Sequence, residues 1–147
     1  MRVRRLVLGD ELVVLRAGYL FDDPPDLPAI REYLADDRNT LLFAFEGSDP
    51  VGFLRATELL QLKTRRRQMF LYEISVDEKF RRRRIGTTLV RTLITMCQEN
   101  GFEEVFVFTD PANTAAVGLY RATGAATDTV ADRMYVYQLH SPMAPPA

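Results

Sequence analysis

The 147-residue sequence predicts one mixed α/β domain, an α+β arrangement in which helices pack on a central sheet. Two observations carry the prediction: clear helical periodicity over 85–99, and a series of short apolar segments bounded by turn residues. The apolar content of 47% is enough to build one core in a chain of this length.

The beginning of the chain is predicted to form a strand and two helices. Residues 3–8 are mainly apolar and suit a first strand, and the spacing of leucine and valine over 11–20 suits a helix. A Pro-Pro pair breaks that helix. A second helix follows over 26–35, where Pro28 is tolerated because it lies in the first turn.

Three strands are predicted next. Residues 40–45 and 51–59 are separated by Glu-Gly-Ser-Asp-Pro, and these turn-forming residues join the two strands as a hairpin. Residues 69–76 are rich in apolar and aromatic side chains and suit a central strand.

The long helix over 85–99 is predicted from its periodicity, because apolar residues recur every four positions from Ile85 to Cys97. Asn100 and Gly101 supply the chemistry of a helix C-terminus. We therefore expect this helix to bury one face against the sheet.

The last part of the chain is predicted to add a strand, a helix and a strand. A fully buried strand is expected over 105–108, a helix over 114–122 capped by Asn113, and a final strand over 134–139. Residues 1–140 would form the domain, and 141–147 a frayed, proline-rich C-terminal tail.

Charge is unevenly distributed along the chain, although the net charge is only −1. Residues 1–60 carry a net charge of −4, residues 61–91 carry +7, and residues 92–147 carry −4. The basic centre suggests an anionic ligand, and the acidic flanks leave room for a cationic one. On charge alone, solvated faces are an equally good interpretation.

Composition also limits which cellular compartment and which kinds of site are expected. With one cysteine and one histidine, neither a disulfide scaffold nor a metal site is expected. No apolar stretch approaches the roughly 20 residues of a membrane span, and the basic N-terminus lacks the apolar region of a signal peptide. We therefore expect a cytoplasmic protein without a membrane partner.

The segment after strand 69–76 has the chemistry of an anion site. A charged loop ends in four arginines, Arg81, Arg82, Arg83 and Arg84, and Gly86 lies at the start of the long helix. First-turn N–H groups have no intrahelical partner and lie at the positive end of the helix dipole, so an anion is favoured there. Arginines add charge-assisted hydrogen bonds, and a glycine lets phosphate approach the backbone. The loop therefore predicts a pyrophosphate site.

The four arginines have two other interpretations, a nucleic-acid surface and a solvated loop. Against nucleic acid, the arginines stand at one strand-to-helix junction, the protein is not basic overall, and no aromatic-interleaved recognition module is visible. We expect no nucleic-acid partner, and the solvated loop stays open as an alternative.

The run from Arg81 to Gly86 resembles the signature (Q/R)-x-x-G-x-(G/A) of the GNAT superfamily of N-acetyltransferases, with Arg84 in place of the first glycine. The resemblance implies a GNAT fold, whose mixed, mostly antiparallel sheet is splayed at the coenzyme A site and flanked by about four helices. It also implies that the backbone of residues 81–87, including Thr87, holds the pyrophosphate of coenzyme A. The backbone of Ile74, Ser75 and Val76 would then pair with pantetheine.

A second GNAT pattern, N-x-x-A-x-x-x-(Y/F), is similar to the segment from Asn113 through Ala116 to Tyr120. The resemblance implies that Asn113 reaches pantetheine while it also caps its helix. It further implies that Tyr120 lies near the thioester sulfur and protonates the departing thiolate as a general acid. The alternative for Tyr120 is a packed aromatic on an amphipathic helix.

Within the superfamily, residues 3–124 resemble the aminoglycoside 3-N-acetyltransferases most closely at 71–76 and 116–120. Two positions depart from that family: Glu73 stands where it has aspartate, and Asn-Thr-Ala at 113–115 replaces its Asp-Asp-Pro. The resemblance implies acetyl-coenzyme A as cosubstrate and an aminoglycoside as acceptor, modified at the 3-amino group. It is compatible with a homodimer, which the residues neither require nor exclude.

Chemistry singles out Glu73 independently of this resemblance. An amine is protonated at neutral pH and must lose a proton before it attacks a thioester, so a carboxylate is needed near the acetyl group. A charged residue inside an apolar strand is costly unless it has a partner or a task. We expect Glu73 to bind the amine and accept its proton, directly or through water. The alternatives are a salt bridge with an arginine and an outward-facing strand residue.

A cationic acceptor also needs negative charge around it. The candidates are Asp22, Asp23 and Asp26 in the proline-bearing loop, Asp110 at a strand end, and Asp128 and Asp132 further on. Asp110 is favoured, because loops at strand ends are where such folds build sites. Each acid alone is as readily a solvated charge, and their shared sign supports the expectation.

The predicted mechanism is direct transfer in a ternary complex. Cys97 lies on the apolar stripe of the long helix and is expected to be buried rather than nucleophilic, and His140 is expected at the surface. The first alternative function is a GNAT enzyme acting on another amine, such as a polyamine, an amino-acid derivative or a protein N-terminus. A non-catalytic acyl-coenzyme A binding module is the second.

Overall fold

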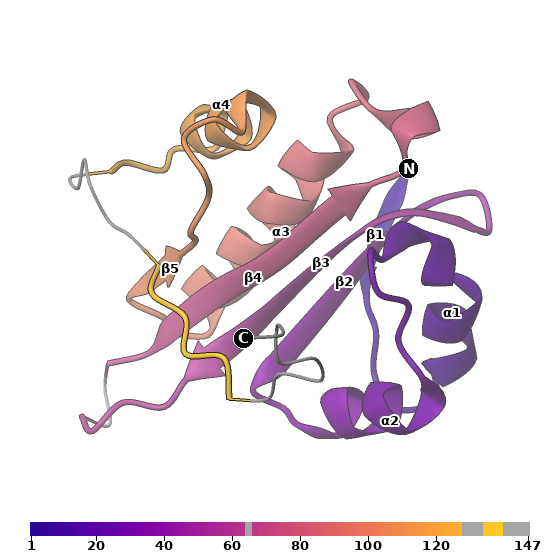
Figure 1. Cartoon of the computed structure of the whole chain (residues 1–147), viewed down its shortest axis with the longest axis horizontal. Helices are drawn as coiled ribbons and strands as arrows, with labels where there is room; N and C mark the ends of the chain where they lie inside the picture. The colour runs from indigo at the N-terminus through magenta and orange to yellow at the C-terminus, as the bar shows by residue number, and fades with distance from the viewer. Residues whose placement is uncertain (64–65, 128–133, 140–147) are drawn as a thin grey trace, which may run out of the picture.

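A five-stranded sheet forms the centre of the computed structural model, which describes residues 1–63, 66–127 and 134–139 (Figure 1). The strands lie in the order of the sequence: β1 (Arg2–Arg5), β2 (Asn39–Glu46), β3 (Asp49–Leu59), β4 (Gln68–Val76) and β5 (Glu104–Phe106). The first four strands pair antiparallel with their neighbours, and β5 pairs parallel to β4. The predicted mixed, mostly antiparallel sheet is confirmed.

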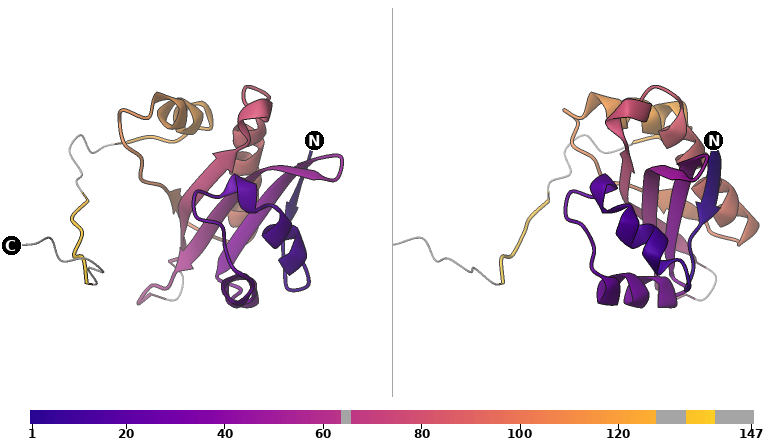
Figure 2. Two further views of the ribbon diagram at one scale, coloured as in Figure 1. Left: turned by 45° about the vertical axis from the view of Figure 1, so that its right-hand side comes forward. Right: turned by 90° about the vertical axis from the view of Figure 1, so that its right-hand side faces the viewer.

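Helices cover both faces of the sheet (Figures 1 and 2). They are α1 (Glu11–Arg16), α2 (Leu27–Ala35), α3 (Ile85–Glu99) and α4 (Thr114–Ala122), with short 3₁₀ helices at Gly18–Leu20 and Glu78–Phe80. Helices α1 and α2 pack on one face, α3 lies along the other, and α4 lies beside α3. Four α-helices agree with the expectation from the sequence.

Two apolar clusters hold these layers together, one on each face of the sheet. On the α3 face, Leu54 and Leu71 of the sheet pack with Leu89 and Leu93 of the helix. On the opposite face, β2 and β3 bury Phe43 and Phe53 beneath α1 and α2, and Phe21 stacks on Phe53 with ring centroids 4.1 Å apart. Because both faces are covered, the middle of β2 is buried throughout.

Gly52 allows α3 to lie close to the β3–β4 pair. A Cβ atom at this position would stand 3.0 Å from the Ser75 carbonyl oxygen and 3.2 Å from Ile85 Cγ2. Both distances are tighter than ordinary contacts, so a larger residue would push β4 and the start of α3 apart. This packing fixes the strand-to-helix junction that the sequence singled out.

Helices α3 and α4 have the boundaries that the sequence predicts. Asn100 is the C-cap of α3, and Gly101 follows with φ of +73°, as C-capping chemistry requires. Helix α4 begins after Asn113, whose side-chain oxygen accepts a hydrogen bond from Ala116 N at 3.1 Å. The structural role expected for Asn113 is therefore confirmed.

Near the C-terminus, one predicted strand is present but shorter and less buried than expected, and another is wrong. Instead of a fully buried strand over 105–108, β5 has three half-buried or exposed residues, and Phe108 is 68% exposed. Residues 134–139 form no strand; they are exposed and lie apart from the sheet (Figure 2). Both segments have high β propensity, but a strand also requires a partner to pair with. The tail expected over 141–147 lies outside the described residues.

Among the described residues, no helix is both long and apolar enough to cross a membrane.

Candidate active site

The loop before α3 presents unpaired backbone donors and four cations. Arg81 to Arg84 are all exposed, and Arg84 occupies the N-cap position without a capping hydrogen bond from its side chain. Thr88 N donates to Arg84 O at 3.0 Å. The N–H groups of Ile85, Gly86 and Thr87 precede the first intrahelical donor and point out of the helix start. An anion fits this position, as the sequence predicts.

Arg84 has a backbone conformation that favours glycine. Its φ is +60°, and Arg82 has a φ of +64°. A side chain in this left-handed region costs about 1–2 kcal/mol. The arginine at the first glycine position of the GNAT signature therefore enters α3 through a left-handed residue.

Gly86 faces another helix in addition to opening α3. A Cβ atom here would stand 3.4 Å from Leu119 Cδ2 of α4. The start of α3 thus lies in van der Waals range of α4, the helix that carries the second GNAT pattern. The loop arginines and Tyr120 are joined in one unit by this contact and by the packing of Leu119 and Tyr120 against the α3 core.

Tyr120 is half-buried against the α3 side of the sheet. Burial raises the pKa of its phenol above the ordinary value. The hydroxyl is therefore protonated at neutral pH and able to donate a proton. Tyr120 also packs against the apolar cluster on the α3 face, as its alternative interpretation as a packed aromatic expects.

The sheet opens between β4 and β5. Their parallel pairing covers only Gln68–Phe70 on β4 and Glu104–Phe106 on β5, so beyond Phe70 strand β4 is paired with β3 alone. Ile74, Ser75 and Val76 lie in this part of β4 and are half-buried. The expected splay is confirmed, and it leaves one edge of β4 open beside the three predicted pantetheine contacts.

A β-bulge at Tyr72 decides which way Glu73 points. Arg55 of β3 pairs with Glu73, whereas the next residue, Ala56, pairs with Leu71, so Tyr72 is an extra residue in β4. Before the bulge, Leu71 packs on the α3 face; after it, Ile74 does. Because neighbouring side chains alternate, Glu73 lies on the face covered by α1 and α2.

Glu73 lines a pocket of about 370 Å³ on that face. The loop after α1 contributes Asp22 and Asp23, β3 contributes Arg55, and β4 contributes Tyr72 and Glu73. We call this the acidic pocket and define it by these five residues. Three carboxylates against one guanidinium make its lining negative, which suits a cationic ligand. The structure thus brings together three of the predicted acids.

The other predicted acids lie elsewhere. The Asp26 side chain caps α2 by accepting a hydrogen bond from Ala29 N at 2.9 Å. Asp110 accepts from Ala112 N at 2.9 Å in the turn before α4. Neither lines the acidic pocket. Asp128, Asp132 and His140 lie outside the described residues.

The arginine partner that the sequence left open for Glu73 is present. Arg55 Nε donates to Glu73 Oε2 at 2.6 Å, and Tyr72 lies over the Arg55 guanidinium at 4.3 Å from CZ to the ring centroid. Sequence reasoning missed Arg55 and Tyr72 as site residues. Arg55 could have been found in the sequence, because it is a single charge in an apolar segment of β3. Its partner Glu73 is likewise a single charge in β4.

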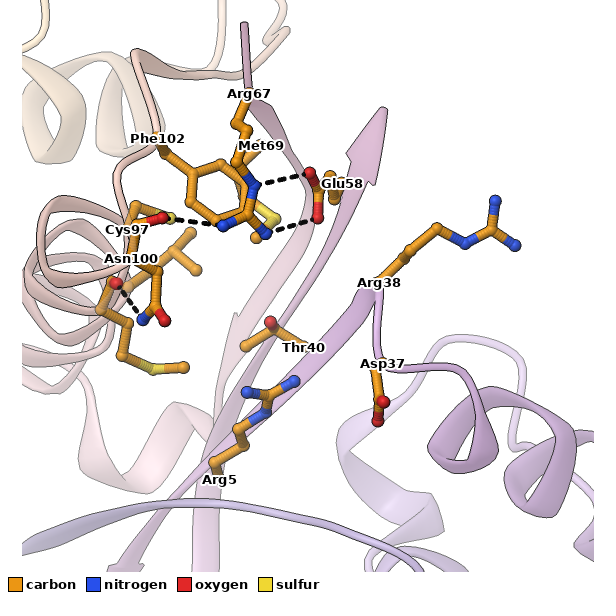
Figure 3. A pocket seen from close by; sticks show the side chains of 12 residues that line it. Arg5, Asp37, Arg38, Thr40, Glu58, Arg67, Met69, Cys97, Asn100 and Phe102 are labelled. Atoms are coloured by element: carbon orange, nitrogen blue, oxygen red, sulfur yellow. Dashed lines mark hydrogen bonds and ion pairs between the residues drawn. The ribbon is translucent and has the colours of Figure 1, made fainter. Parts of the chain in front are cut away.

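Cys97 belongs to a second pocket, of about 140 Å³, near the C-terminal end of α3 (Figure 3). Its side chain is buried, and burial raises the pKa of the thiol to about 11. Above it, Arg67 forms two hydrogen bonds with Glu58, at 2.8 and 2.9 Å, and stacks on Phe102. The thiol is therefore protonated and enclosed at neutral pH, as expected for a structural cysteine. The described part of the chain holds no cluster of metal-ligating side chains.

The model of the acetyltransferase (GNAT) family matches residues 10–125 of the chain. Among curated proteins, N-acetyltransferase family 8 member 3 of Rattus norvegicus is 30% identical over 105 residues, which cover 71% of this chain and 45% of that protein. The probable N-acetyltransferase camello of Xenopus laevis is 32% identical over 99 residues, 67% of this chain and 44% of that protein. The chain spans less than half the length of these curated relatives.

Solved structures show the same fold. An aminoglycoside acetyltransferase, meta-AAC0020 from an uncultured soil metagenomic sample, in complex with sisomicin, matches with a TM-score of 0.80 at 24% identity, over 93% of this chain and 96% of that one. A second soil enzyme of this class, HMB0005, matches with a TM-score of 0.76 at 26% identity, over 92% and 98%. AAC(6')-Iy with a bisubstrate analogue matches at 0.74 and 22% identity, over 95% and 98%.

The family match covers the arginine loop, the splayed sheet and the helix of Tyr120, which are the parts that carry the predicted site. The chain therefore belongs to the GNAT family of acetyltransferases.

Proposed function

We propose that this GNAT acetyltransferase transfers acetyl from acetyl-coenzyme A to an amine of an aminoglycoside, at the 3-amino group. The observation that carries the proposal is the acidic pocket, which opens on the α1 and α2 side of β4 where the strand is splayed from β5. Its negative lining suits a polycationic sugar. Two solved structures with the same fold are aminoglycoside acetyltransferases, one of them in complex with sisomicin.

The anionic end of acetyl-coenzyme A fits the loop before α3. The proposed pyrophosphate ligands are the backbone and side chains from Arg81 to Arg84, with the free N–H groups of Gly86 and Thr87. The open edge of β4 at Ile74, Ser75 and Val76 would bind pantetheine, with Asn113 and Ala116 at the start of α4 on its other side. When bound, this cosubstrate supplies the thioester whose carbon–sulfur bond is broken.

The chain's own residues would then carry the proton transfers. Glu73 accepts a proton from the bound ammonium group, directly or through water, and so frees the amine lone pair for attack on the acetyl carbon. Backbone N–H groups at the splayed part of β4 stabilise the negative charge that develops on the acetyl oxygen. Tyr120 donates its phenolic proton to the sulfur as the carbon–sulfur bond breaks, and the second proton that the acetylated nitrogen loses restores the phenol. Asp22 and Asp23 hold the other ammonium groups of the acceptor.

A second candidate function is acetylation of a different amine. The curated relatives at about 30% identity are N-acetyltransferases of family 8 and camello, not aminoglycoside enzymes. This candidate keeps the same coenzyme residues and the same base, and it assigns the acidic pocket to a polyamine, an amino-acid derivative or a protein N-terminus. A homodimer stays a prediction under either function.

Free-thiol release from acetyl-coenzyme A, measured with gentamicin, sisomicin, kanamycin and spermidine, tests the proposal. We expect turnover with gentamicin or sisomicin, followed by product NMR that places the acetyl group on the 3-amino nitrogen. Turnover with spermidine alone would favour the second candidate. Binding of coenzyme A without thiol release for any amine would identify a non-catalytic binding module.

A further inference from the structure

We infer that Arg55 is the positioning residue for Glu73 and that Tyr72 holds Arg55 in place. The inference rests on the proposed function, because it assigns a role to Arg55 only if Glu73 accepts the proton of the amine. Neither Arg55 nor Tyr72 belongs to the two GNAT patterns in the sequence. Their role follows from the contacts at the bulge of β4.

Arg55 and Glu73 form a directed contact. They are paired across β3 and β4, and Arg55 Nε donates to Glu73 Oε2 at 2.6 Å. The side chains are 35% and 29% exposed, so both are partly removed from water within the acidic pocket. Among the described residues, Oε1 of Glu73 accepts no hydrogen bond. One carboxylate oxygen is therefore fixed by the guanidinium, and the other is available to the acceptor amine.

Tyr72 limits the movement of Arg55. The bulge makes Tyr72 an additional residue of β4, and its ring lies over the Arg55 guanidinium at 4.3 Å. The ring is itself supported by Phe70, in an edge contact with centroids 5.7 Å apart. Cation–π stacking leaves the in-plane donors of the guanidinium free, so Arg55 can stack on Tyr72 and hydrogen-bond to Glu73 together.

The charge of the acidic pocket explains why such a contact is needed. Glu73 shares the pocket with Asp22 and Asp23, and carboxylates repel one another. Without a cation, the flexible side chain of Glu73 would have many orientations, and proton transfer requires a defined one. Among the described residues, Arg55 is the only cation that lines this pocket, and it contacts the carboxylate that the mechanism uses.

A double-mutant cycle separates a positioning role from simple stabilisation of the sheet. We compare the chain with Arg55→Gln, Glu73→Gln and the double variant, and measure kcat and KM for sisomicin, or for the best amine of the panel. Arg55→Gln should lower kcat roughly 10- to 100-fold, the range expected for losing a charge-assisted hydrogen bond. In the Glu73→Gln background the same change should lower kcat less than about twofold.

Tyr72 provides a second test that leaves both residues of the ion pair unsubstituted. Tyr72→Phe keeps the ring, so its kcat should be roughly three- to fivefold higher than that of Tyr72→Leu, which loses the cation–π contact. Tyr72 is 60% exposed, so both variants should fold. Thermal unfolding and coenzyme A affinity, measured for each variant, should match the unsubstituted chain.

The outcomes distinguish the two proposals. If Arg55→Gln lowers kcat equally with and without Glu73, or if Tyr72→Leu equals Tyr72→Phe, the positioning role of Arg55 is wrong and the proposed function is unaffected. If Glu73→Gln retains full kcat, or if the unsubstituted chain acetylates no amine, the proposed function fails first and the inference fails with it.

Discussion

Arg55 and Glu73 lie directly opposite each other on β3 and β4, and a hydrogen bond of 2.6 Å joins Arg55 Nε to Glu73 Oε2. The pair lines a pocket whose other charged residues, Asp22 and Asp23, are acidic. An ion pair in a sheet is commonly a stabilising contact. Its place beside the open edge of β4 gives this one a proposed role in acetyl transfer, and the following predictions test the site and the fold around it.

Glu73→Gln keeps the size of the side chain and removes its ability to accept a proton. We expect kcat to fall roughly 10²- to 10⁴-fold, the range for losing a general base, with the affinity for coenzyme A unchanged. Steady-state kinetics and calorimetry measure the two quantities. Glu99→Gln, an exposed change at the far end of α3, is the matched control. Unchanged turnover in Glu73→Gln would remove the base assignment.

Tyr120→Phe should slow the step in which coenzyme A leaves. Because burial raises the pKa of the Tyr120 phenol above its ordinary value, the group is protonated at neutral pH and titrates at a higher pH than a free tyrosine. The pH profile of kcat should therefore show no loss from Tyr120 below about pH 10. The phenylalanine variant should lose roughly 10- to 100-fold in kcat. An alkaline limb near pH 8 that disappears in Tyr120→Phe would contradict this assignment.

Arg84→Gly should stabilise the protein, because glycine adopts φ of +60° without the steric penalty of a side chain. Relief of this penalty is partly offset, because glycine also increases the conformational entropy of the unfolded chain. The free energy of unfolding should therefore rise by about 0.5–1 kcal/mol. Denaturant unfolding measures the change. Arg83→Gly, at a neighbour whose φ is negative, is the control and should lower stability. Equal effects of the two substitutions would mean that strain at Arg84 is negligible.

The Glu58–Arg67 pair should make stability depend on pH. The hydrogen bonds from Arg67 hold the pKa of the Glu58 carboxyl below its usual range. The contribution of the pair is then complete above the unfolded pKa of about 4.3 and is lost as pH falls through the lower folded pKa. Glu58→Gln should cost about 1 kcal/mol at pH 7, since Arg67 is partly exposed, and progressively less below pH 4. A constant difference from pH 7 to pH 3 would contradict this.

Cys97 should resist labelling in the folded protein. Its side chain is buried and its thiol pKa is raised to about 11, so the reactive thiolate is scarce at pH 8. We expect a disulfide reagent to modify it only after denaturation, and Cys97→Ala to retain full kcat. Loss of turnover in Cys97→Ala without loss of fold would instead indicate an acetyl-cysteine intermediate.

Sequence periodicity predicted the helices of this fold better than it predicted the edge of the sheet. Helix α3 buries one face, so its apolar spacing recorded its boundaries, and the Asn113 cap marked the start of α4. The segments 105–108 and 134–139 have similar strand-forming composition, yet pairing depends on neighbours that a local pattern does not encode. The shortness of β5 is also what opens the sheet.

The sequence predicted the anion loop and Glu73 of the candidate site. It predicted the residues of the acidic pocket less completely. Arg81 to Gly86 are contiguous, so a local motif describes them. Asp22, Asp23 and Arg55 meet Glu73 only through the tertiary fold. Asp26 is the opposite case. Its charge suggested a residue that binds the cationic acceptor, but its side chain caps the N-terminus of α2.

The bulge at Tyr72 lets Leu71 and Ile74, which are three residues apart, both face α3. If β4 kept all its residues and lost the bulge, strict alternation from Leu71 would turn Glu73 from the acidic pocket into the apolar layer beneath α3. Deleting Tyr72 itself would restore regular pairing and leave Glu73 opposite Arg55, on the face of the acidic pocket. In libraries of variants, a single-codon deletion at this position should therefore remove the stacked ring and keep the ion pair.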